Sequence, residues 1–265
     1  STPIKSSAAS DVYKRQLKSG AVAPQDVWVY DHHKENMAAL QAEHPGVHEA
    51  ESEEAAADAV EALVLAVKPH AVLPLISALS EGDRELPLLI SIAAAVTLDE
   101  MEERACDGTR IVRAMPNTPC MVLSGVIAYS PGTAVTDEDE EAARRLLSGC
   151  GSVFKVEESR MNAVSAISGC GPAYMFTALD ALSDAGVAMG LPRKTALELA
   201  AGTMLGSALM LEQTGEHPMA LRDAVTSPGG TTIAALNALD ECGFRNAWIQ
   251  AVKSAVRRAE EMEGN

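Results

Sequence analysis

The order in which short apolar runs and amphipathic stretches follow one another constrains the fold of this chain more than any other feature. Between residues 27 and 156, runs rich in Val and Ile alternate with stretches of helical periodicity. The predicted strands are 27–30, 63–67, 88–92, 111–115, 126–129 and 153–156, and the predicted helices are 34–43, 53–59, 71–79, 97–104 and 137–147. Strands separated by helices of this length predict an α/β fold with a doubly wound, mainly parallel sheet.

Beyond residue 158 the pattern contains no further strand candidates. Five stretches with helical periodicity follow, at 172–189, 192–213, 218–225, 229–239 and 244–262. We therefore predict two domains, a dinucleotide-binding Rossmann-like domain at 1–158 and an all-helical domain at 159–265. The first two of these helices are apolar around much of their circumference, so we expect a second copy of the chain to cover them and the protein to be at least a dimer.

Charge and cysteine usage exclude several classes of protein. The 265 residues carry a formal net charge of -16, and Lys and Arg form no cluster, which argues against nucleic acid or an anionic membrane as a partner. No apolar run approaches the roughly 18 residues of a membrane-spanning helix. Five cysteines, an odd number with no C-x-x-C pair, predict neither a disulfide framework nor a zinc site, and they favour the cytoplasm.

Two glycine-rich segments have the composition of helix starts whose backbone N–H groups are covered by few side chains. In SPGGTTI at 227–233, Ser227 suits the N-cap, Pro228 suits the first helical position, and the two glycines leave backbone N–H groups open to a small carboxylate. SGCGPAY at 168–174 repeats this arrangement before another apolar helix. Each segment alone is also compatible with an ordinary helix start, but together they favour a binding site.

Polar residues follow two of the predicted strands, at the ends where doubly wound sheets bind their ligands. The strand 63–67 runs into Lys68, which suits a phosphate or a ribose and is explained equally well as a solvated loop residue. The strand 111–115 runs into PNTP at 116–119, where two prolines hold the amide of Asn117 in a stiff loop. Such a loop suits an amide or carbonyl ligand, although a rigid connector would have the same sequence.

Five motifs together resemble the pyrroline-5-carboxylate reductase family, and the resemblance is collinear from about Leu17 to the C-terminus. They are AVKP at 66–69, PNTP at 116–119, SGCGPAY at 168–174, GLPR at 190–193 and SPGGTTI at 227–233. The resemblance implies reduction of 1-pyrroline-5-carboxylate to L-proline, the last step of proline biosynthesis, with NADPH or NADH as the cofactor. It also implies a substrate site between the Rossmann domain of one subunit and the helical domain of its partner, in a homodimer or in the rings of dimers that the family forms.

The same resemblance assigns roles to individual residues. Ser227 and the amides of Gly229, Gly230 and Thr231 would hold the substrate carboxylate, and Thr232 would be the catalytic residue, with its hydroxyl near the imine nitrogen. The segment 169–172 would pack near the reacting carbon. The expected cofactor contacts are Ala66, Val67, Lys68, Pro69, Ala93 and Asn117.

Asp31 bears on the choice between NADH and NADPH. It follows the strand 27–30, at a position where an acid normally accepts the ribose 2′-OH and disfavours a 2′-phosphate. Because His32, His33 and Lys34 offset its charge, the sequence favours NADH only weakly and leaves NADPH open. An N-cap role for a helix over 32–43 explains Asp31 equally well.

The front of the chain departs from the family pattern. A Rossmann domain opens with a strand and a G-x-G-x-x-G turn, whereas the only glycines before residue 60 are Gly20 and Gly46. Residues 1–16 contain no apolar strand, and helical periodicity resumes around 11–19. We therefore predict that the first strand and its glycine loop are missing or replaced, which a truncated or mis-assembled N-terminus explains better than a natural variant, and that the cofactor binds weakly.

Two alternatives remain besides the reductase. A reductase of the β-hydroxyacid dehydrogenase type has the same layout but needs a catalytic lysine on its helical domain, and the candidates Lys194 and Lys253 do not lie in a glycine-rich constellation. A non-catalytic dimeric protein with a degenerate nucleotide site is the other alternative, because the N-terminal glycine loop is absent from the sequence. Neither alternative accounts for the five motifs together.

Overall fold

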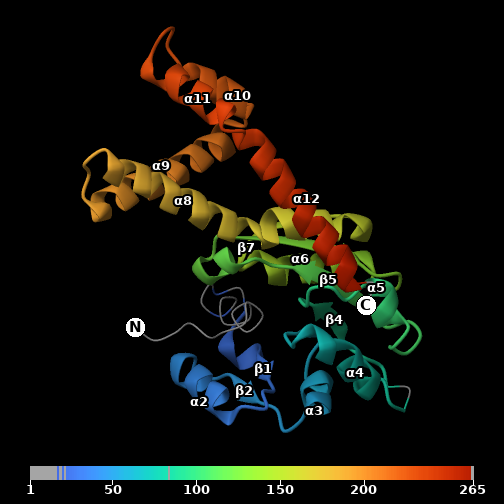
Figure 1. Ribbon diagram of the computed structural model, residues 1–265. Helices are drawn as coiled ribbons and strands as arrows, with labels where there is room; N and C mark the ends of the chain where they lie inside the picture. The colour runs from blue at the N-terminus through green and yellow to red at the C-terminus, as the bar shows by residue number, and fades with distance from the viewer. Residues whose placement is uncertain (1–16, 18–19, 21, 83, 264–265) are drawn as a thin grey trace. The chain divides into compact units, whose positions relative to one another are not determined.

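The computed structural model describes residues 17, 20, 22–82 and 84–263, which form two compact units (Figure 1). The first unit contains the chain up to Cys170 together with the residues from Val256 onward, and the second is Gly171–Ala255. Of the helical residues expected around 11–19, only Leu17 is described as helical, and the rest of that expectation lies outside the described residues. In the described part of the chain no helix is long and apolar enough to span a bilayer.

The first unit contains two sheets. One is a short parallel pair, β1 (Trp28–Val29) with β2 (His48–Glu49). The other has the order β3-β4-β5-β6-β7, with strands β3 (Ala62–Leu65), β4 (Leu88–Ser91), β5 (Ile111–Met115), β6 (Gly125–Pro131) and β7 (Gly151–Lys155). Every pair in it is parallel except β5 with β6. The doubly wound, mainly parallel α/β fold is thus confirmed.

The antiparallel pairing of β5 with β6 follows from the short connection between them. Residues 116–124 contain the 3-10 helix η2 (Thr118–Val122) and are fewer than the dozen or more residues that a parallel crossover needs. Leu123 ends η2 in the left-handed conformation, with φ of 58°, and so turns the chain back. The predicted mainly parallel sheet thus contains this one antiparallel pair, for which the short connection is the reason.

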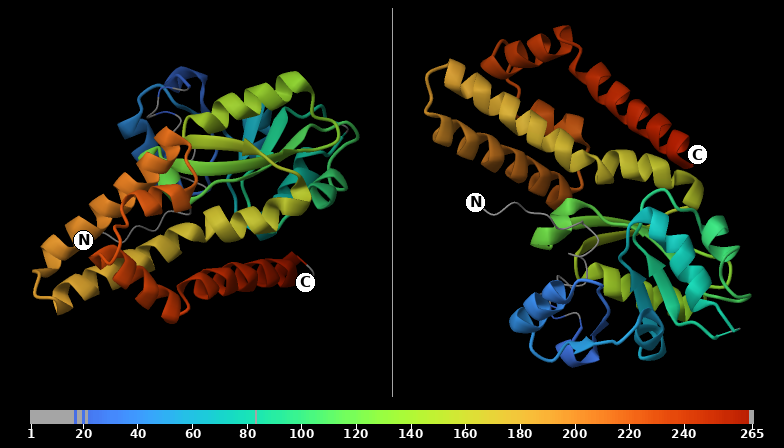
Figure 2. Two further views of the ribbon diagram at one scale, coloured as in Figure 1. Left: turned by 90° about the horizontal axis from the view of Figure 1, so that it is seen from above. Right: turned by 60° about the horizontal axis from the view of Figure 1, so that its bottom comes forward.

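Helices on both faces of the larger sheet build its core, as both views of Figure 2 show. Leu88 and Ile90 of β4 belong to a cluster with Ala143 and Leu147 of the helix α6. Their neighbour Leu89 belongs to a second cluster with residues of α4 and α5. The alternation along β4 therefore buries both faces, which is why its sequence is continuously apolar. The helices of this unit are α2 (Lys34–Glu43), α3 (Glu53–Asp58), α4 (Pro69–Leu79), α5 (Leu98–Glu102), α6 (Asp137–Ser148) and α7 (Met161–Val164).

The second unit is helical throughout its described residues. Its helices are α8 (Gly171–Ala188), α9 (Arg193–Thr214), α10 (Pro218–Ala224), α11 (Thr231–Glu241) and α12 (Phe244–Glu263), the last of which continues into the first unit. Gly186 lets α8 approach α9 closely, because a Cβ there would lie 2.9 Å from the Cβ of Ala196. Arg193 ties the two helices together through hydrogen bonding to the Ser183 hydroxyl at 3.1 Å.

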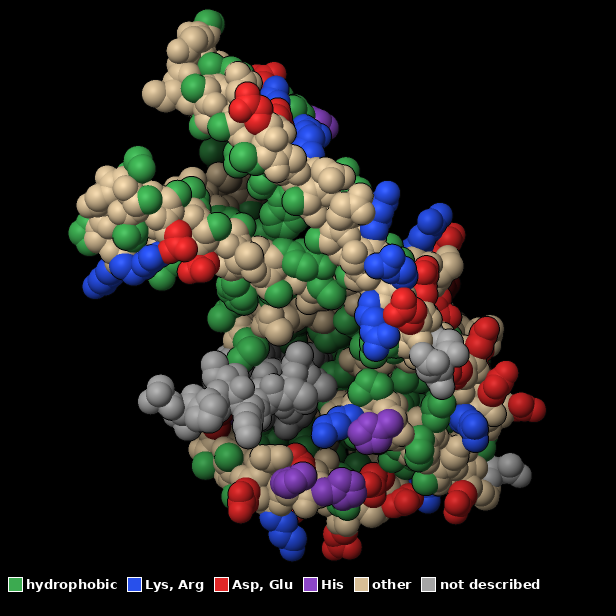
Figure 3. Space-filling model, viewed as in Figure 1, with side chains coloured by type: hydrophobic (Ala, Val, Ile, Leu, Met, Phe, Trp, Pro, Cys, Tyr) green, Lys and Arg blue, Asp and Glu red, His purple; other side chains and the backbone are tan. Residues whose placement is uncertain are grey.

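Large apolar side chains of the second unit are exposed in a single subunit. Phe176 of α8 is 66% exposed and Leu205 of α9 is 62% exposed. Hydrophobic side chains also gather on the visible surface of these helices in Figure 3. Burial of such a surface is strongly favourable, so the helices α8 and α9 lack part of the core that would cover them. This agrees with the expectation that a second copy covers them.

Candidate functional site

The residues expected to contact a cofactor lie at the carboxyl ends of four strands in the first unit. Asp31 follows β1, and residues 66–69 follow β3. Ala93 follows β4, and Asn117 follows β5. Because β3, β4 and β5 are neighbours and run parallel, their carboxyl ends form one edge of the sheet, where ligands of this fold bind. The structure therefore brings the candidates after these three strands to one edge.

Lys68 and Pro69 start a helix at this edge. Lys68 is the N-cap of α4 in an extended conformation, and Pro69 occupies the first helical position. The helix thus begins two residues earlier than the pattern of apolar residues predicts. Proline suits the first helical position, because the N–H of that position makes no hydrogen bond within the helix and its loss costs nothing. No side chain caps α4, but Pro69 has no N–H and the Ala71 N–H donates to the Lys68 carbonyl at 2.9 Å, so the first turn offers an anion the His70 N–H beside the exposed Lys68.

Ala93 lies in a loop, residues 92–97, that is held in an unusual conformation. Ala93 is 5% exposed. Two residues later, Ala95 adopts a left-handed backbone with φ of 57°, which is unfavourable for any residue with a Cβ. The loop ends at Thr97, the N-cap of α5, which forms a capping box with Glu100. A strained alanine next to a candidate cofactor contact indicates that the surrounding structure fixes this loop.

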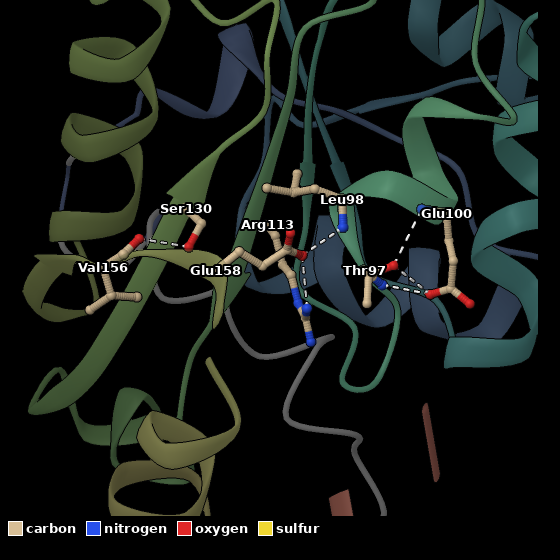
Figure 4. Close-up of polar contacts among 7 residues, drawn as sticks. All are labelled: Thr97, Leu98, Glu100, Arg113, Ser130, Val156 and Glu158. Carbon is tan, nitrogen blue, oxygen red and sulfur yellow. Dashed lines mark hydrogen bonds and ion pairs between the residues drawn. The ribbon is translucent and has the colours of Figure 1, made fainter. Parts of the chain in front are cut away.

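Glu158 connects the end of the loop 92–97, at Leu98, to Arg113 on the central strand β5 (Figure 4). Its Oε1 accepts a hydrogen bond from the Leu98 N–H at 2.6 Å and pairs with Arg113 Nη1 at 2.9 Å. The Arg113 side chain is 5% exposed on β5, so the ion pair lies largely out of water. Ser130 of β6 is tied to the chain just before Glu158, because its hydroxyl donates to the Val156 carbonyl at 2.8 Å. Sequence reasoning missed this pair, although an arginine inside an apolar strand was a signal for it.

Asn117 is buried, and its amide connects two of the motifs. Its Nδ2 donates to the Ser168 carbonyl at 3.0 Å, and its Oδ1 accepts from the Val126 N–H at 2.9 Å. The whole Asn117 residue is 7% exposed, so its side chain points into the protein from the PNTP loop. The amide carries two hydrogens, and the bond to Ser168 uses one of them. A contact of Asn117 with the cofactor stays a prediction beside this structural role.

Asp31 is held by residues of the following helix rather than capping it. The N-cap of α2 is His33, so the alternative that Asp31 caps a helix from residue 32 is wrong. Instead, Asp31 Oδ1 accepts from the His33 N–H at 2.8 Å and Oδ2 accepts from the Asn36 amide at 2.8 Å. Partial burial raises the pKa of Asp31, but these hydrogen bonds outweigh it and leave the pKa below its usual value. The carboxylate is therefore charged at neutral pH, as an acceptor for a ribose hydroxyl must be.

The SPGGTTI segment in the second unit starts a helix, but later than predicted. Gly230 is the N-cap and α11 begins at Thr231, whereas the sequence pattern placed the cap at Ser227. The preceding residues form a tight turn instead, in which the Gly230 N–H donates to the Ser227 carbonyl at 3.1 Å and Gly229 has φ of 67°. Pro228 before a glycine of positive φ favours such a turn over a helical start.

The corrected helix start still suits a carboxylate. No side chain caps α11, so the N–H groups of its first turn have no intrahelical partner and no cap. A Cβ on Gly230 would lie 2.4 Å from the Ser227 hydroxyl, which explains why this position is a glycine. Thr232 is half-buried in the first turn of the helix, and Thr231 is exposed. A carboxylate site at this segment stays a prediction, and the helix start on which it depends lies at Thr231.

The SGCGPAY segment does not start a helix from an open loop. The chain is already helical before it, in α7 and then in a π-helical turn over Ser165–Gly169. The Cys170 N–H donates to the Ser165 carbonyl at 2.8 Å, five residues back, and α8 follows from Gly171. The expectation of a second bare helix start is wrong here, because the π turn takes up the residues that were expected to form a loop. Such turns are frequent at functional sites.

Neither lysine of the dehydrogenase alternative lies in an enclosed site. The Lys194 side chain is 88% exposed in the first turn of α9, where it is 3.9 Å from Glu198. Lys253 is exposed on α12. Within the described ranges, no group of three His, Cys, Asp or Glu side chains is arranged to hold a metal ion. The geometry therefore gives no support to a catalytic lysine at either position.

Comparisons with known proteins agree along most of the chain. Residues 158–262 match the family described as pyrroline-5-carboxylate reductase dimerisation. Residues 7–95 match the family described as NADP oxidoreductase coenzyme F420-dependent. The pyrroline-5-carboxylate reductase of Escherichia coli K12 is 38% identical over 246 residues, which cover 93% of this chain and 91% of that protein. The enzyme of the same name from Synechocystis is 40% identical and covers 96% of this chain and 94% of its own length.

Solved structures show the same likeness. A pyrroline-5-carboxylate reductase from Coxiella burnetii superposes with a TM-score of 0.90 at 32% identity, covering 96% of this chain and 94% of that chain. The pyrroline carboxylate reductase of Plasmodium falciparum, solved with NADP bound, has a TM-score of 0.83 at 28% identity with the same coverage. The fold and the order of the elements are therefore shared along almost the entire length of these proteins.

Proposed function

Because this chain belongs to the pyrroline-5-carboxylate reductase family, we propose that it reduces 1-pyrroline-5-carboxylate to L-proline with NADPH or NADH. The observation that carries the proposal is the uncapped start of α11 with Thr232 in its first turn. A cyclic imino acid offers the two groups that this segment complements, a carboxylate for the open N–H groups and a ring nitrogen for a hydroxyl. The family likeness over most of the chain supports the same reaction.

The substrate half of the proposed site uses backbone and hydroxyl groups. The amides of Gly229 and Thr231 and the Ser227 hydroxyl bind the carboxylate, aided by the positive end of the α11 dipole. The Gly230 N–H, expected from the sequence to take part, donates to the Ser227 carbonyl in the turn instead. Thr232 places its hydroxyl at the ring nitrogen and orients the imine. A protonated imine is already electrophilic, so the protein's main contribution is to hold the reacting atoms in position. This accounts for a site without a catalytic His or carboxylate.

The residues present fit part of a nicotinamide dinucleotide. The charged Asp31 suits the ribose hydroxyls, and Lys68, Pro69, Ala66, Val67, Ala93 and Asn117 lie at the strand ends that would face the rest of the cofactor. When bound, the cofactor supplies the hydride. The pyrophosphate lacks its usual partner, because no G-x-G-x-x-G turn occurs among the described residues. We therefore propose that this chain binds the cofactor weakly.

Self-association agrees with the family match of residues 158–262 and with the exposed apolar side chains of α8 and α9. We propose further that residues 159–265 act as the dimerisation and substrate-binding domain, and that dimers assemble into rings. Light scattering of the purified protein measures the number of subunits and tests both. The cytoplasm is the proposed location, supported by the five cysteines, none of which forms a disulfide in the part of the chain that the structure describes.

The reaction is tested by adding pyrroline-5-carboxylate and NADH or NADPH to the purified chain, and by following both cofactor absorbance and proline formation. Consumption of the reduced cofactor with proline as the product supports the proposal. A turnover of β-hydroxyacids instead would support the dehydrogenase alternative. Self-association without consumption of either substrate, at millimolar cofactor, would support the non-catalytic alternative.

A further inference from the structure

Two neighbouring histidines, His32 and His33, follow Asp31 at the carboxyl end of β1. Both side chains are well exposed, 75% for His32 and 80% for His33. Their ring nitrogens differ, because among the described residues both nitrogens of His32 have a protein contact, whereas His33 has one at Nδ1 alone. This difference leaves one ring nitrogen beside Asp31 open to a ligand.

The His32 ring connects the end of β1 to the start of α3. Its Nδ1 lies 3.3 Å from the Tyr30 hydroxyl, and its Nε2 lies 3.4 Å from Glu53 Oε1. An ionised carboxylate can only accept, so Nε2 carries the ring proton and Nδ1 accepts from the tyrosine. Tyr30 also contacts this ring edge-on, with ring centroids 5.2 Å apart. The protein therefore uses both polar atoms of the His32 side chain.

The His33 ring has a different arrangement. Its Nδ1 lies 3.3 Å from Asp31 Oδ1, and the same oxygen accepts from the His33 backbone N–H at 2.8 Å. Because the charged Asp31 carboxylate only accepts, Nδ1 carries the proton of the neutral ring and Nε2 presents a lone pair. A second proton on the ring turns Nε2 into a charged donor. One atom thus accepts or donates a hydrogen bond according to the charge of the ring.

The two forms of the cofactor differ in the group that such an atom would meet. NADH has a 2′-hydroxyl on its adenosine ribose, whereas NADPH has a 2′-phosphate with a charge between about −1.5 and −2 at neutral pH. An acid at this kind of strand end accepts the ribose 2′-hydroxyl in dinucleotide-binding sheets. A neutral Nε2 suits the hydroxyl as a further acceptor, and a charged N–H donor suits the phosphate.

The charges around His33 disfavour a phosphate as long as the ring is neutral. The charged groups there, on the segment itself and on α3 beside His32, are Asp31, Lys34, Glu35 and Glu53. The acids outnumber the lysine, so the sum of these charges is negative and repels a 2′-phosphate. A proton on His33 opposes this repulsion at the one ring nitrogen that is open to a ligand.

We propose that His33 is the residue that selects the 2′ group of the cofactor, accepting NADH when its ring is neutral and NADPH when its ring is protonated. Histidine is the side chain whose charge ordinarily changes between about pH 5 and 8, so the preference follows the pH within this range. NADH is preferred at the alkaline end, and NADPH binds increasingly well as the pH falls. The inference rests on the proposed function, because that function places the adenosine ribose beside Asp31.

The test measures direct binding of NADP⁺ and NAD⁺ to the full chain by calorimetry. The two dinucleotides differ only at the 2′ position, so the ratio of their Kd values cancels every contact that they share, including any weakness at the pyrophosphate. Between about pH 8 and about pH 6.5 the phosphate stays mainly dianionic, because its second pKa is about 6. The Kd ratio of NADP⁺ to NAD⁺ should fall at least about fivefold as the pH is lowered across this window.

Three variants assign the change to Nε2 of His33. His33→Asn keeps an amide that can donate to Asp31 and a residue type that suits the N-cap of α2, but it has no Nε2, so its Kd ratio should change less than about twofold. His32→Asn is the matched control at a similarly exposed neighbour, and it should keep the wild-type pH dependence. His33→Lys places a lasting positive charge there and should lower the ratio already at about pH 8.

The outcomes separate this inference from the proposed reaction. A Kd ratio that stays constant in the wild type, or that changes equally in His33→Asn, overturns the inference, and turnover of pyrroline-5-carboxylate by the same protein would still keep the proposed function. A ratio that follows the pH through His33 without any turnover supports the inference and counts against the reaction. If neither dinucleotide binds at millimolar concentration, the inference falls together with the cofactor edge at Asp31.

Discussion

Arg113 and Glu158 form an ion pair, with Nη1 and Oε1 2.9 Å apart, that links the centre of β5 to the loop after β4. Glu158 Oε1 also accepts the Leu98 N–H, so one carboxylate holds both the buried guanidinium and the start of α5. Ala93, a proposed cofactor contact, lies in the loop that this carboxylate anchors. The pair therefore connects the stability of the sheet with the shape of the proposed cofactor edge.

Glu158→Gln should destabilise the protein and weaken cofactor binding. The substitution removes the charge that faces Arg113 while keeping the shape, and losing a hydrogen-bonded charge partner costs about 1.5 to 3 kcal/mol. Denaturant unfolding measures this loss, and nucleotide titration measures the cofactor. Glu141→Gln is the control, because its pair with Arg144 is screened by solvent and should contribute little to stability. Equal effects of the two substitutions would contradict the anchoring role.

Asn117→Ala should destabilise the chain through two partners that lose their hydrogen bonds. The Ser168 carbonyl and the Val126 N–H, both in half-buried residues, would each remain without the amide, at about 1 kcal/mol for each group, the lower end of the range for buried groups. Thermal unfolding measures the loss, with the exposed neighbour in Thr118→Ala as the control. A stability change for Asn117→Ala no larger than that of the control would show that solvent satisfies both groups.

Ala95→Gly should stabilise the protein, which is unusual for an alanine-to-glycine change. The left-handed conformation costs an L-residue about 1 to 2 kcal/mol, whereas glycine loses roughly 0.5 to 1 kcal/mol in added chain entropy, so a net gain of about 0.5 to 1 kcal/mol is expected. The adjacent Ala94→Gly has no such strain to relieve and should destabilise the protein slightly. Denaturant midpoints of the two variants should therefore move in opposite directions, and movement in the same direction would contradict the strain.

Tyr129 should make the stability depend on pH in the alkaline range. Burial and the hydrogen bond to Glu140 Oε1, 2.8 Å away, raise the pKa of Tyr129 to about 12. A raised pKa means that the folded state holds the proton more tightly. The contribution is therefore complete below the unfolded pKa of about 10 and is lost as the pH rises toward 12.

The measurement is the free energy of unfolding of Tyr129→Phe and the wild type across this alkaline window. The variant should lose stability less steeply than the wild type. Ultraviolet difference titration of the phenol gives an independent reading of the same group. If Tyr129→Phe and the wild type show parallel curves, the phenol does not titrate as proposed.

Periodicity alone predicts the elements that have a buried face. The strand at 111–115 and the helix at 34–43 match β5 and α2, since each has a regular apolar pattern. The strand β2 was missed because His48 and Glu49 are both exposed and carry no such pattern. Short polar strands paired by backbone groups alone give no periodic signal.

The candidate site shows a different limit of sequence reasoning. Composition identified SPGGTTI as an anion-binding helix start, but Gly229 at positive φ turns the chain and moves the start to Thr231. The π turn before α8 contains a backbone hydrogen bond from the Cys170 N–H to the Ser165 carbonyl, and the residue types in this segment do not predict such a bond. Likewise, the partner of Arg113 is Glu158, 45 residues away, and only tertiary packing brings the two together.

Thr232→Ala should lower turnover without removing the carboxylate site. The backbone amides at the start of α11 remain, so binding of a carboxylate ligand such as L-proline, measured by calorimetry, should change by less than about threefold. Loss of the hydroxyl that orients the imine should lower kcat on the order of a hundredfold, as for other single donors at a reacting group. Circular dichroism and thermal unfolding check that the helix is intact.

Thr231→Ala is the matched control for this prediction. Its side chain is exposed, and only its backbone amide is assigned to the carboxylate, so both kcat and ligand binding should stay near the wild-type values. The two residues are neighbours of the same type in the first turn of α11 and differ in the role of the hydroxyl. Wild-type turnover in Thr232→Ala would remove that residue from the reaction, and an equal loss in both variants would point to the helix start itself.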